Sequence, residues 1–189
     1  MVITGIANHP NQLHERTDLP SSELVFLASQ GLREYKATQL ITSLSPGWEL
    51  ALAAAANELD IPYIVAIPYP GRDQEWKGES RIRYYDALAR AFEVYQVADN
   101  YEENVMLECH HWMVDRADMI LALWSYEFFG ETFDVIDYGI KNDITVTNLW
   151  RDWESLYTLK RTSRVKMGRI QRGGAQVFES KSSQRIRDE

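Results

Sequence analysis

The sequence predicts an α/β fold, an open and mostly parallel sheet with helices on both faces. Strand-like and helix-like patterns alternate six times over the first 150 residues, which favours repeated βαβ units. One run, IPYIVAI, is apolar on both of its faces, as is typical of a strand that helices cover from both sides. In such sheets, ligands bind beyond the carboxyl ends of the strands, where the strand order reverses.

Six strands are expected from short apolar or β-rich runs bounded by turn residues. The fourth, FEVYQV, alternates between apolar and polar residues and therefore indicates an edge strand. In the stretch 118–141 an apolar run, a glycine turn and a helical pattern follow one another. This stretch contains the fifth strand and precedes the sixth. The expected strands cover residues 2–6, 39–44, 61–67, 92–97, 119–123 and 144–149.

Five helices are expected between these strands. Ser21 or Ser22 is suited to cap the first, because a serine side chain accepts a hydrogen bond from a free N–H of the first turn. The second is rich in alanine, whose small side chain lets a helix lie close to a sheet. The expected helices cover residues 22–35, 47–59, 79–90, 101–117 and 132–141. Apolar residues at helical spacing predict the inward faces of the first, third and fourth helices: Leu24, Leu27, Ala28 and Leu32; Ile82, Tyr85, Leu88 and Ala89; Val105, Cys109, Trp112 and Met113.

The net charge of −8 is unevenly distributed along the chain. Residues 151–189 hold ten basic and five acidic residues, so residues 1–150 hold ten basic and 23 acidic ones, a net charge of −13. An acidic body repels a polyanionic backbone, and double-stranded nucleic acid is therefore not expected as its partner. We expect one domain over residues 1–153 and a basic arm or tail over residues 154–189, which has too few apolar residues to pack on its own.

The sequence also constrains the compartment. No run of 18 apolar residues is present, so no membrane span is predicted, and the start MVITGIANHP lacks the features of a secretion signal. The single cysteine, Cys109, cannot form an internal disulfide and fits a reducing environment. A cytoplasmic location is expected on these grounds.

Three polar, glycine-bearing turns follow expected strands and are the main candidates for a ligand site. They lie at residues 5–10, 43–49 and 130–132, where a helix N-terminus offers free backbone N–H groups to an anionic or polar ligand. Each turn can also be only a tight connection, and the helix dipole alone can stabilise Glu49. Nearby tryptophan and tyrosine residues are candidates for pocket walls or for stacking on a base. The candidate ligand-binding residues are Gly5, Asn8, Ser43, Ser45, Gly47, Glu49, Tyr69, Trp76, Arg116, Trp124, Gly130, Glu131 and Thr132.

No metal site or catalytic motif stands out in the sequence. His110 and His111 are adjacent, so on a helix they point about 100° apart and cannot hold one ion from one face. Cys109 lies on an apolar stripe and is expected in the core rather than as a nucleophile. Neither a metal nor a cofactor is expected.

Several runs together resemble the YpsA-like branch of the SLOG superfamily. They are ITGIANHP, SLSPGWELALAAA, IPYIVAIPYPGRDQEWKGESRIRYYDAL, WMVDRADMILALW, GET and ITVTNLW, and they cover about residues 2–150. The superfamily consists of Rossmann-like domains related to the LOG nucleotide hydrolases and to the DNA-processing protein DprA. The resemblance implies a Rossmann-like fold, a nucleotide-like ligand and assembly into a homo-oligomer, most simply a dimer.

The chain departs from the pattern of this family at all three turns. Its first turn has Asn8-His9-Pro10 where the family usually shows a G-H-R sequence. Its second has Ser45-Pro46-Gly47-Trp48-Glu49 where the family has a glycine-rich turn that ends in aspartate. Its third turn has Glu131 in place of the second glycine of G-G-T, which adds bulk and negative charge where a phosphate would approach. This difference predicts a less anionic ligand, such as a nucleoside, or a site that has decayed. The LOG enzymes use an arginine and a glutamate whose nearest matches here are Arg116 and Asp134, so their activity is not carried over.

Three functional hypotheses from different classes remain open at this point. The first is a SLOG-type protein that binds a nucleotide-like small molecule as a sensor or by sequestering it. The second is a hydrolase or transferase acting on the N-glycosidic bond of nucleotides, in which Glu49 or Glu131 stabilises the reacting centre or acts as nucleophile. The third is an interaction module with a vestigial pocket. Whether the protein is an enzyme is left open.

Overall fold

The structure, a computed structural model, describes residues 1–8, 20–76 and 78–158 of the chain. Its centre is a sheet of six strands in the order β4-β3-β2-β1-β5-β6, and every neighbouring pair is parallel. The open parallel α/β sheet predicted from the sequence is thereby confirmed. The strands are β1 (Val2–Ala7), β2 (Gln39–Thr42), β3 (Tyr63–Ile67), β4 (Glu93–Gln96), β5 (Met119–Leu123) and β6 (Thr145–Asn148).

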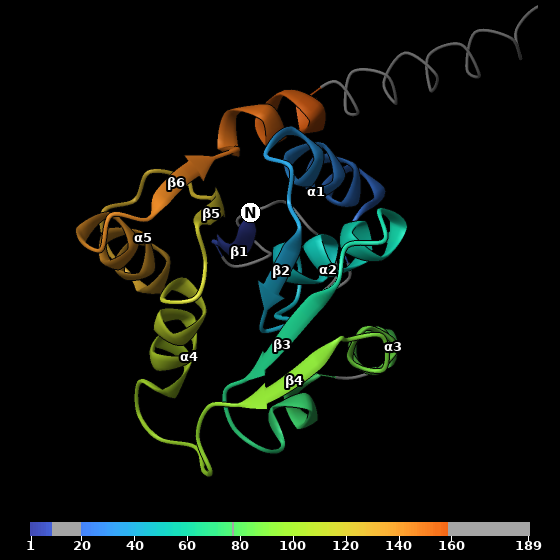
Figure 1. Ribbon diagram of the computed structural model, residues 1–189, viewed down its shortest axis with the longest axis vertical. Coiled ribbons are helices and arrows are strands. Elements are labelled where there is room, and N and C mark those ends of the chain that lie inside the picture. The colour runs from blue at the N-terminus through green and yellow to red at the C-terminus, as the bar shows by residue number, and fades with distance from the viewer. Residues whose placement is uncertain (9–19, 77, 159–189) are drawn as a thin grey trace, which may run out of the picture. The chain divides into compact units, whose positions relative to one another are not determined.

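Helices connect the strands and cover both faces of the sheet. Figure 1 shows α1, α2 and α3 on one side of the sheet and α4 and α5 on the other. The helices are α1 (Ser22–Glu34), α2 (Trp48–Glu58), α3 (Glu79–Leu88), α4 (Val105–Val114) and α5 (Glu131–Lys141), and a short 3-10 helix, η1 (Arg72–Glu75), follows β3. Residues 150–158 are helical as well.

The strand order reverses at β1. From β1 the chain adds β2, β3 and β4 on one side, and it then crosses over to place β5 and β6 on the other. Because all strands are parallel, the carboxyl ends of β1 and β5 lie together at this reversal, where ligands bind in sheets of this kind. The fold therefore brings the segments that follow β1, β2 and β5 to one edge of the sheet.

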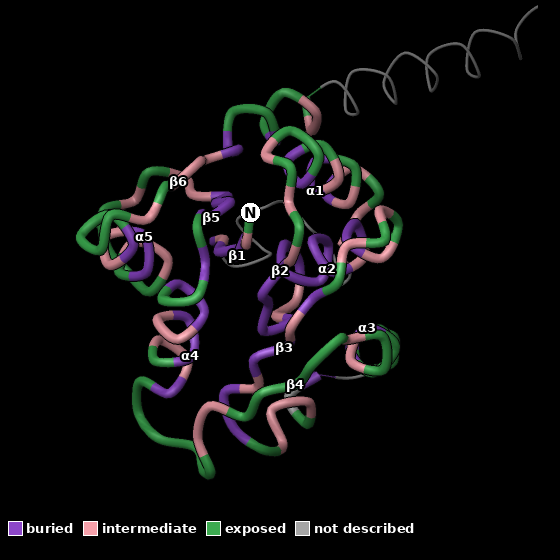
Figure 2. The backbone as a smooth tube through the Cα atoms, in the orientation of Figure 1, coloured by how far each residue is buried: buried purple, intermediate pink, exposed green. Residues whose placement is uncertain are grey.

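The core follows the apolar pattern of the central strands. All five residues of β5 are buried, whereas all four residues of β4 are exposed at the edge of the sheet, as Figure 2 shows. On α1 the buried face contains Leu24, Leu27, Ala28 and Leu32, and the Ser21 hydroxyl accepts a hydrogen bond from the Leu24 N–H at 3.2 Å. The expected edge strand, inward stripe and N-cap are all confirmed.

The inward face of α3 differs from the prediction. Ile82 and Tyr85 were expected inside but are 60% and 46% exposed, and the buried residues are Ser80, Tyr84 and Ala87. The Tyr85 hydroxyl donates a hydrogen bond to Asp73 at 2.6 Å, and the Tyr84 ring packs against Trp76. These contacts with η1 set the rotation of the helix, and the apolar spacing of a single helix does not contain them.

Helix α4 is shorter than predicted. It begins at Val105 rather than at residue 101, because Asn104 adopts a left-handed conformation with φ of 82° just before it. Asparagine adopts this conformation more readily than other residues with a side chain, so it is suited to a chain reversal. Of the residues expected inside, Val105, Cys109 and Met113 are buried and Trp112 is only partly buried.

Residues Met1–Trp153 form one compact unit. No helix among the residues that the structure describes is long and apolar enough to cross a membrane. The part of the first turn from His9 onward and residues 159–189 of the basic arm lie outside the described residues. The expected division into a domain and an arm stays a prediction.

Gly5 holds helix α2 close to β1 and does not line the pocket described below. A methyl group at this position would collide with Leu52 Cδ1 and would lie 3.4 Å from the indole of Trp48. Both neighbours belong to α2, whose Trp48 opens the helix and whose Glu49 is part of the candidate site. Glycine at this position therefore sets the distance between the central strand and the helix that carries the site.

We predict that Gly5→Ala lowers the free energy of unfolding by about 1–3 kcal/mol, because an added methyl overpacks the interface. Leu52→Ala alone removes buried methyl groups and is expected to cost about 2–5 kcal/mol. In the double variant the new methyl occupies space that Leu52 has vacated, so the loss is expected to be smaller than the sum of the two. Urea denaturation of the three variants measures this, and strictly additive losses would contradict the predicted contact.

Candidate functional site

A pocket of about 630 Å³ lies where the segments after β1, β2 and β5 meet. The three polar turns that the sequence analysis identified as candidates for a ligand site all contribute residues to the lining of this pocket. Seven of the predicted ligand-binding residues line it: Asn8, Ser45, Glu49, Trp76, Gly130, Glu131 and Thr132. Their roles toward a ligand stay predictions.

The first and third turns are bound to each other by hydrogen bonds. The N–H of Asn8 donates to the carbonyl of Leu123 at 3.0 Å, and its side-chain oxygen accepts from the Ser125 N–H at 2.7 Å. The hydroxyl of Thr132 donates to the carbonyl of Ala7 at 3.0 Å. Asn8 therefore extends the pairing of β1 with β5 by one residue, and Thr132 fixes the start of α5 against the end of β1.

The second turn wraps around the carboxylate of Glu49, a side chain that is 4% exposed. Its Oε2 accepts a hydrogen bond from the Ser43 N–H at 2.5 Å and another from the Thr42 hydroxyl at 3.3 Å. Gly47, with φ of 85°, turns the chain so that Glu49 lies in the first turn of α2. Burying a carboxylate is costly unless it is hydrogen-bonded and paired, and these donors supply part of that requirement.

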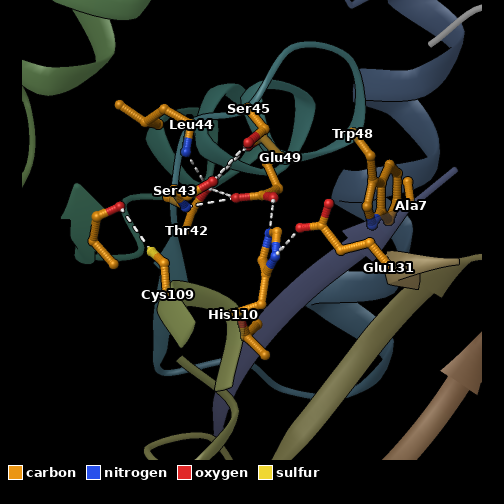
Figure 3. Close-up of polar contacts among 12 residues, drawn as sticks. Ala7, Thr42, Ser43, Leu44, Ser45, Trp48, Glu49, Cys109, His110 and Glu131 are labelled. Atoms are coloured by element: carbon orange, nitrogen blue, oxygen red, sulfur yellow. Dashed lines mark hydrogen bonds and ion pairs between the residues drawn. The ribbon is translucent and has the colours of Figure 1, made fainter. Parts of the chain in front are cut away.

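His110, from α4, supplies the rest. Its Nε2 lies 3.3 Å from Glu49 Oε1, and its Nδ1 lies 2.9 Å from Oε1 of Glu131, the first residue of α5. Figure 3 shows the imidazole ring between the two carboxylates. The contact with Glu131 has the distance of an ion pair, but Nδ1–H is not aimed at the oxygen as in a hydrogen bond. Three helices that are separate in sequence thus contribute one charged cluster, Glu49–His110–Glu131.

The two carboxylates keep the imidazole charged. Burial by itself lowers the pKa of His110, but Glu131 and Glu49 outweigh it and raise the pKa to about 9. Burial likewise tends to raise the pKa of Glu49, and His110 together with the Ser43 donor brings it below its ordinary value. His110 and, more weakly, the charge of Arg72 lower the pKa of Glu131 despite partial burial. At neutral pH the cluster therefore holds one cation and two anions.

Glu131 is the accessible member of the cluster. Its side chain is 49% exposed, against 5% for His110 and 4% for Glu49. Gly130 precedes it with φ of 86°, a conformation that residues with side chains rarely adopt, and a Cβ there would meet nothing within 4 Å. This glycine turns the chain so that Glu131 begins α5 on the wall of the pocket.

Four other predicted residues do not line the pocket. They stabilise the turns and strands around it. Gly5 contacts α2, Ser43 is buried and its hydroxyl pairs with that of Ser45 at 2.7 Å, and Gly47 caps α2. Tyr69 is buried with its ring against the ring of Tyr101.

Two more predicted residues lie elsewhere. The guanidinium of Arg116 lies 4.1 Å from the ring centre of Trp112, beyond the end of α4 that is opposite the pocket. The indole N–H of Trp124 donates to the carbonyl of Glu127 at 2.9 Å, and its ring packs in an aromatic cluster with Tyr126 and Phe133. Trp124 therefore shapes the loop that leads to Gly130 without lining the pocket.

The sequence analysis did not identify His110, Arg72, Trp48 or Phe129 as site residues, yet all four line the pocket. His110 was examined only as a metal ligand. A usable signal was its place next to Cys109 and near Met113 on the buried side of α4, because a polar residue there requires a buried partner. Among the described residues, no group of three or more His, Cys, Asp or Glu side chains is arranged to hold a metal ion.

We predict that the protein becomes less stable as the pH rises from about 6.5 to 9. The pKa of His110 is 6.5 in an unfolded chain and about 9 in the folded protein. The charged imidazole therefore contributes its full stabilisation below pH 6.5, and this contribution is lost as the pH rises to 9. The total change is on the order of 3 kcal/mol. Urea denaturation between pH 6 and 10 measures it. Burial raises the pKa of the Cys109 thiol from 9.0 to about 12, so ionisation of this thiol in the unfolded chain adds a further loss of stability above about pH 9, and the loss between pH 6.5 and 9 is the part assigned to His110.

Two variants separate His110 from other titrating groups. Glu131→Gln removes one of the two carboxylates that raise the pKa, so the loss of stability should be smaller and should occur at lower pH. His111→Gln alters the neighbouring histidine, which stacks on Tyr138 and whose pKa burial lowers, so it should keep the wild-type loss of stability above pH 6.5. A flat profile in the wild-type protein would show that His110 is not held as a cation.

No family model matches the chain, and no curated protein matches it. Among solved structures it is similar to DNA processing protein A (DprA) from Streptococcus pneumoniae, with 10% identity and a TM-score of 0.51 over 76% of this chain and 48% of that one. It is also similar to DprA from Helicobacter pylori, with 11% identity and a TM-score of 0.52 over 77% of this chain and 63% of that one. The latter is described as binding single-stranded DNA. The chain thus matches less than two thirds of either DprA, and at this identity the likeness establishes a Rossmann-like fold.

Proposed function

We propose that this protein binds a nucleotide-like small molecule in the pocket at the reversal of the strand order, as a sensor or by sequestering it. The observation that carries the proposal is the meeting of three polar turns and the Glu49–His110–Glu131 cluster in one pocket. Its volume of about 630 Å³ falls in the range of small-molecule sites, roughly 300–1,000 Å³. A YpsA-like SLOG protein, which the sequence resembles, would have its ligand at this place.

Aromatic side chains in the lining support a ligand with a flat base. Phe129 is 74% exposed and lines the pocket, and Trp76, the residue after η1, lines it as well. An exposed aromatic ring beside a polar cluster offers a base a stacking surface while polar groups meet the remainder of the ligand. The Trp76 ring packs against Tyr84 and has the Arg72 guanidinium 5.5 Å from its centre, so Phe129 is the ring more open to a ligand.

Single-stranded DNA is the second candidate, because both similar structures are DprA proteins and one is described as binding it. The charge of this chain disfavours that ligand. Residues 1–150 carry a net charge of −13, whereas proteins that bind single strands normally present a positively charged groove. The basic arm remains available for such a contact, but its residues from 159 onward lie outside the described part of the chain.

Hydrolysis or transfer at an N-glycosidic bond remains the enzymatic alternative. Glu131 is a half-exposed carboxylate on the pocket wall, and His110 keeps it ionised, as a nucleophile or an electrostatic stabiliser requires. A binding experiment that includes product analysis separates this alternative from binding alone. If no ligand binds, the remaining hypothesis is an interaction module with a vestigial pocket.

We predict that the full chain binds nucleosides or nucleotides and that Phe129→Ala weakens this binding. Loss of a base–aromatic stack costs about 1–3 kcal/mol, which corresponds to a loss of roughly 5- to 150-fold in affinity. Calorimetry with a panel of nucleosides, nucleotides and a single-stranded oligonucleotide measures the affinities, and chromatography of each mixture detects products. Phe26→Ala, at a 52% exposed site on α1, is the matched control and should leave binding unchanged.

The outcomes of this panel separate the candidates. Binding of the oligonucleotide alone would reject a small-molecule role in favour of a DprA-like one. A released base would establish the enzymatic alternative, and equal affinities of wild type and Phe129→Ala would contradict the stacking role of this ring.

We also predict a homo-oligomer, most simply a two-fold dimer. Edge strand β4 offers one surface for it, because it has β3 on one side and no neighbour on the other in the sheet of the described residues, and its Val94 and Tyr95 are 46% and 45% exposed. Sedimentation velocity at micromolar concentration measures the mass, and Val94→Lys should shift any dimer on this edge toward monomer. A monomeric wild-type protein would contradict the prediction.

A further inference from the structure

The charges that line the pocket do not favour a phosphate. Its charged residues are three carboxylates, Glu49, Glu127 and Glu131, and two cations, Arg72 and His110. With His110 protonated, the formal charge of the lining is −1. The single buried cation already has a carboxylate on each side, at 3.3 Å and 2.9 Å.

The N-terminus of α5 is also occupied by the carboxylates of this chain. Glu131 is its first residue, and Asp134 lies in its first turn. The positive end of a helix dipole normally attracts an anionic ligand group. Here negatively charged side chains fill that position. A phosphate, which is also negative, is therefore repelled at the point where the fold would otherwise bind it.

Glu131 and His110 together require a ligand group that both donates and accepts hydrogen bonds. Glu131 is ionised and half exposed, and its second carboxylate oxygen points away from His110, as Figure 3 shows. An ionised carboxylate only accepts hydrogen bonds. His110 Nδ1 is buried and lies 2.9 Å from Glu131 Oε1 without an aligned hydrogen bond, so its N–H is a donor that a ligand oxygen can satisfy.

A hydroxyl group meets both requirements, because it donates its proton to a carboxylate and accepts from an N–H. A fully ionised phosphate is an acceptor alone and would leave Glu131 facing another anion. The neutral part of a nucleotide that carries such hydroxyls is its ribose.

We propose that the pocket selects a ribonucleoside over its phosphorylated forms, with a ribose hydroxyl donating to Glu131. This inference rests on the proposed function and specifies its ligand class. Glu131 acts as the recognition residue, His110 acts as the positioning residue that keeps its carboxylate ionised, and Glu49 holds the imidazole of His110. The third turn thereby selects for a sugar hydroxyl and against a phosphate.

Calorimetry of the full chain tests the selection directly. The titrants are the four ribonucleosides, their 2′-deoxy and 3′-deoxy analogues and their 5′-monophosphates. We expect at least one ribonucleoside to bind about tenfold or more tightly than its monophosphate. Removing the recognised hydroxyl should cost roughly tenfold or more, because a hydrogen bond to a charged group is among the stronger ones.

Variants at Glu131 test the role of its carboxylate, with circular dichroism to establish that each variant is folded. Glu131→Gln keeps the size of the side chain but removes the charge, and should abolish most of the preference for the nucleoside over the monophosphate. Glu131→Gly should increase affinity for the monophosphate by about fivefold, as expected for removing a like charge at a partly exposed site. The matched control is Asp137→Asn, which removes a charge from the same helix beyond its first turn and outside this pocket, and should preserve the nucleoside preference.

Each result has a distinct consequence. A monophosphate that binds the wild-type protein as tightly as its nucleoside, or more tightly, overturns the selection while the proposed function stands. A nucleoside preference that persists in Glu131→Gln, or is lost equally in Asp137→Asn, overturns the recognition by Glu131. If no nucleoside or nucleotide binds at all, the proposed function fails and this inference fails with it.

Discussion

Burial of the Glu49 carboxylate is the constraint on which the arrangement of the pocket depends. A charge that is 4% exposed requires donors and a counter-ion, and the chain supplies them from separate places. The turn after β2 provides the Ser43 N–H, and α4 provides His110. Helix α2 lies on one side of the sheet and α4 on the other, so their ion pair joins the two helix layers. Removing His110 would leave the Glu49 carboxylate buried without its counter-ion, so a change on one side of the sheet destabilises the other side as well.

The same interaction explains why the third turn has a glutamate at its accessible position. His110 neutralises Glu49, and Glu131 then adds a second negative charge on the ring nitrogen that Glu49 does not reach. The imidazolium is thus shared between one structural and one accessible carboxylate. Because the shared cation lowers the pKa of Glu131, this carboxylate stays ionised without a full counter-ion of its own. An ionised, half-exposed acceptor at a helix N-terminus is suited to recognition of neutral donors and unsuited to anions.

Most of the fold could be predicted from the sequence, because it depends on local patterns. The apolar run of β5 was predicted with its observed bounds, and the Ser21 cap follows from the chemistry of one residue. The rotation of α3 could not be predicted, since the hydrogen bond of Tyr85 to Asp73 joins residues from two elements. The start of α4 was predicted four residues too early. Residues 101–104 have a composition compatible with a helix, but the left-handed conformation of Asn104 excludes them from it.

The candidate site was predictable to the extent that turns at strand ends converge in a parallel sheet. That argument locates Glu49 and Glu131 but says nothing of His110, which comes from the middle of a helix on the opposite face. The topology brings β5 beside β1, and only then does α4, which precedes β5, lie over the second turn. A buried histidine on an apolar stripe signals that a polar partner exists without saying where. The crossover from β4 to β5 is what brings His110 to Glu49, and this is a long-range feature of the fold. The chemistry of this pocket therefore depends on the topology and not on any single motif.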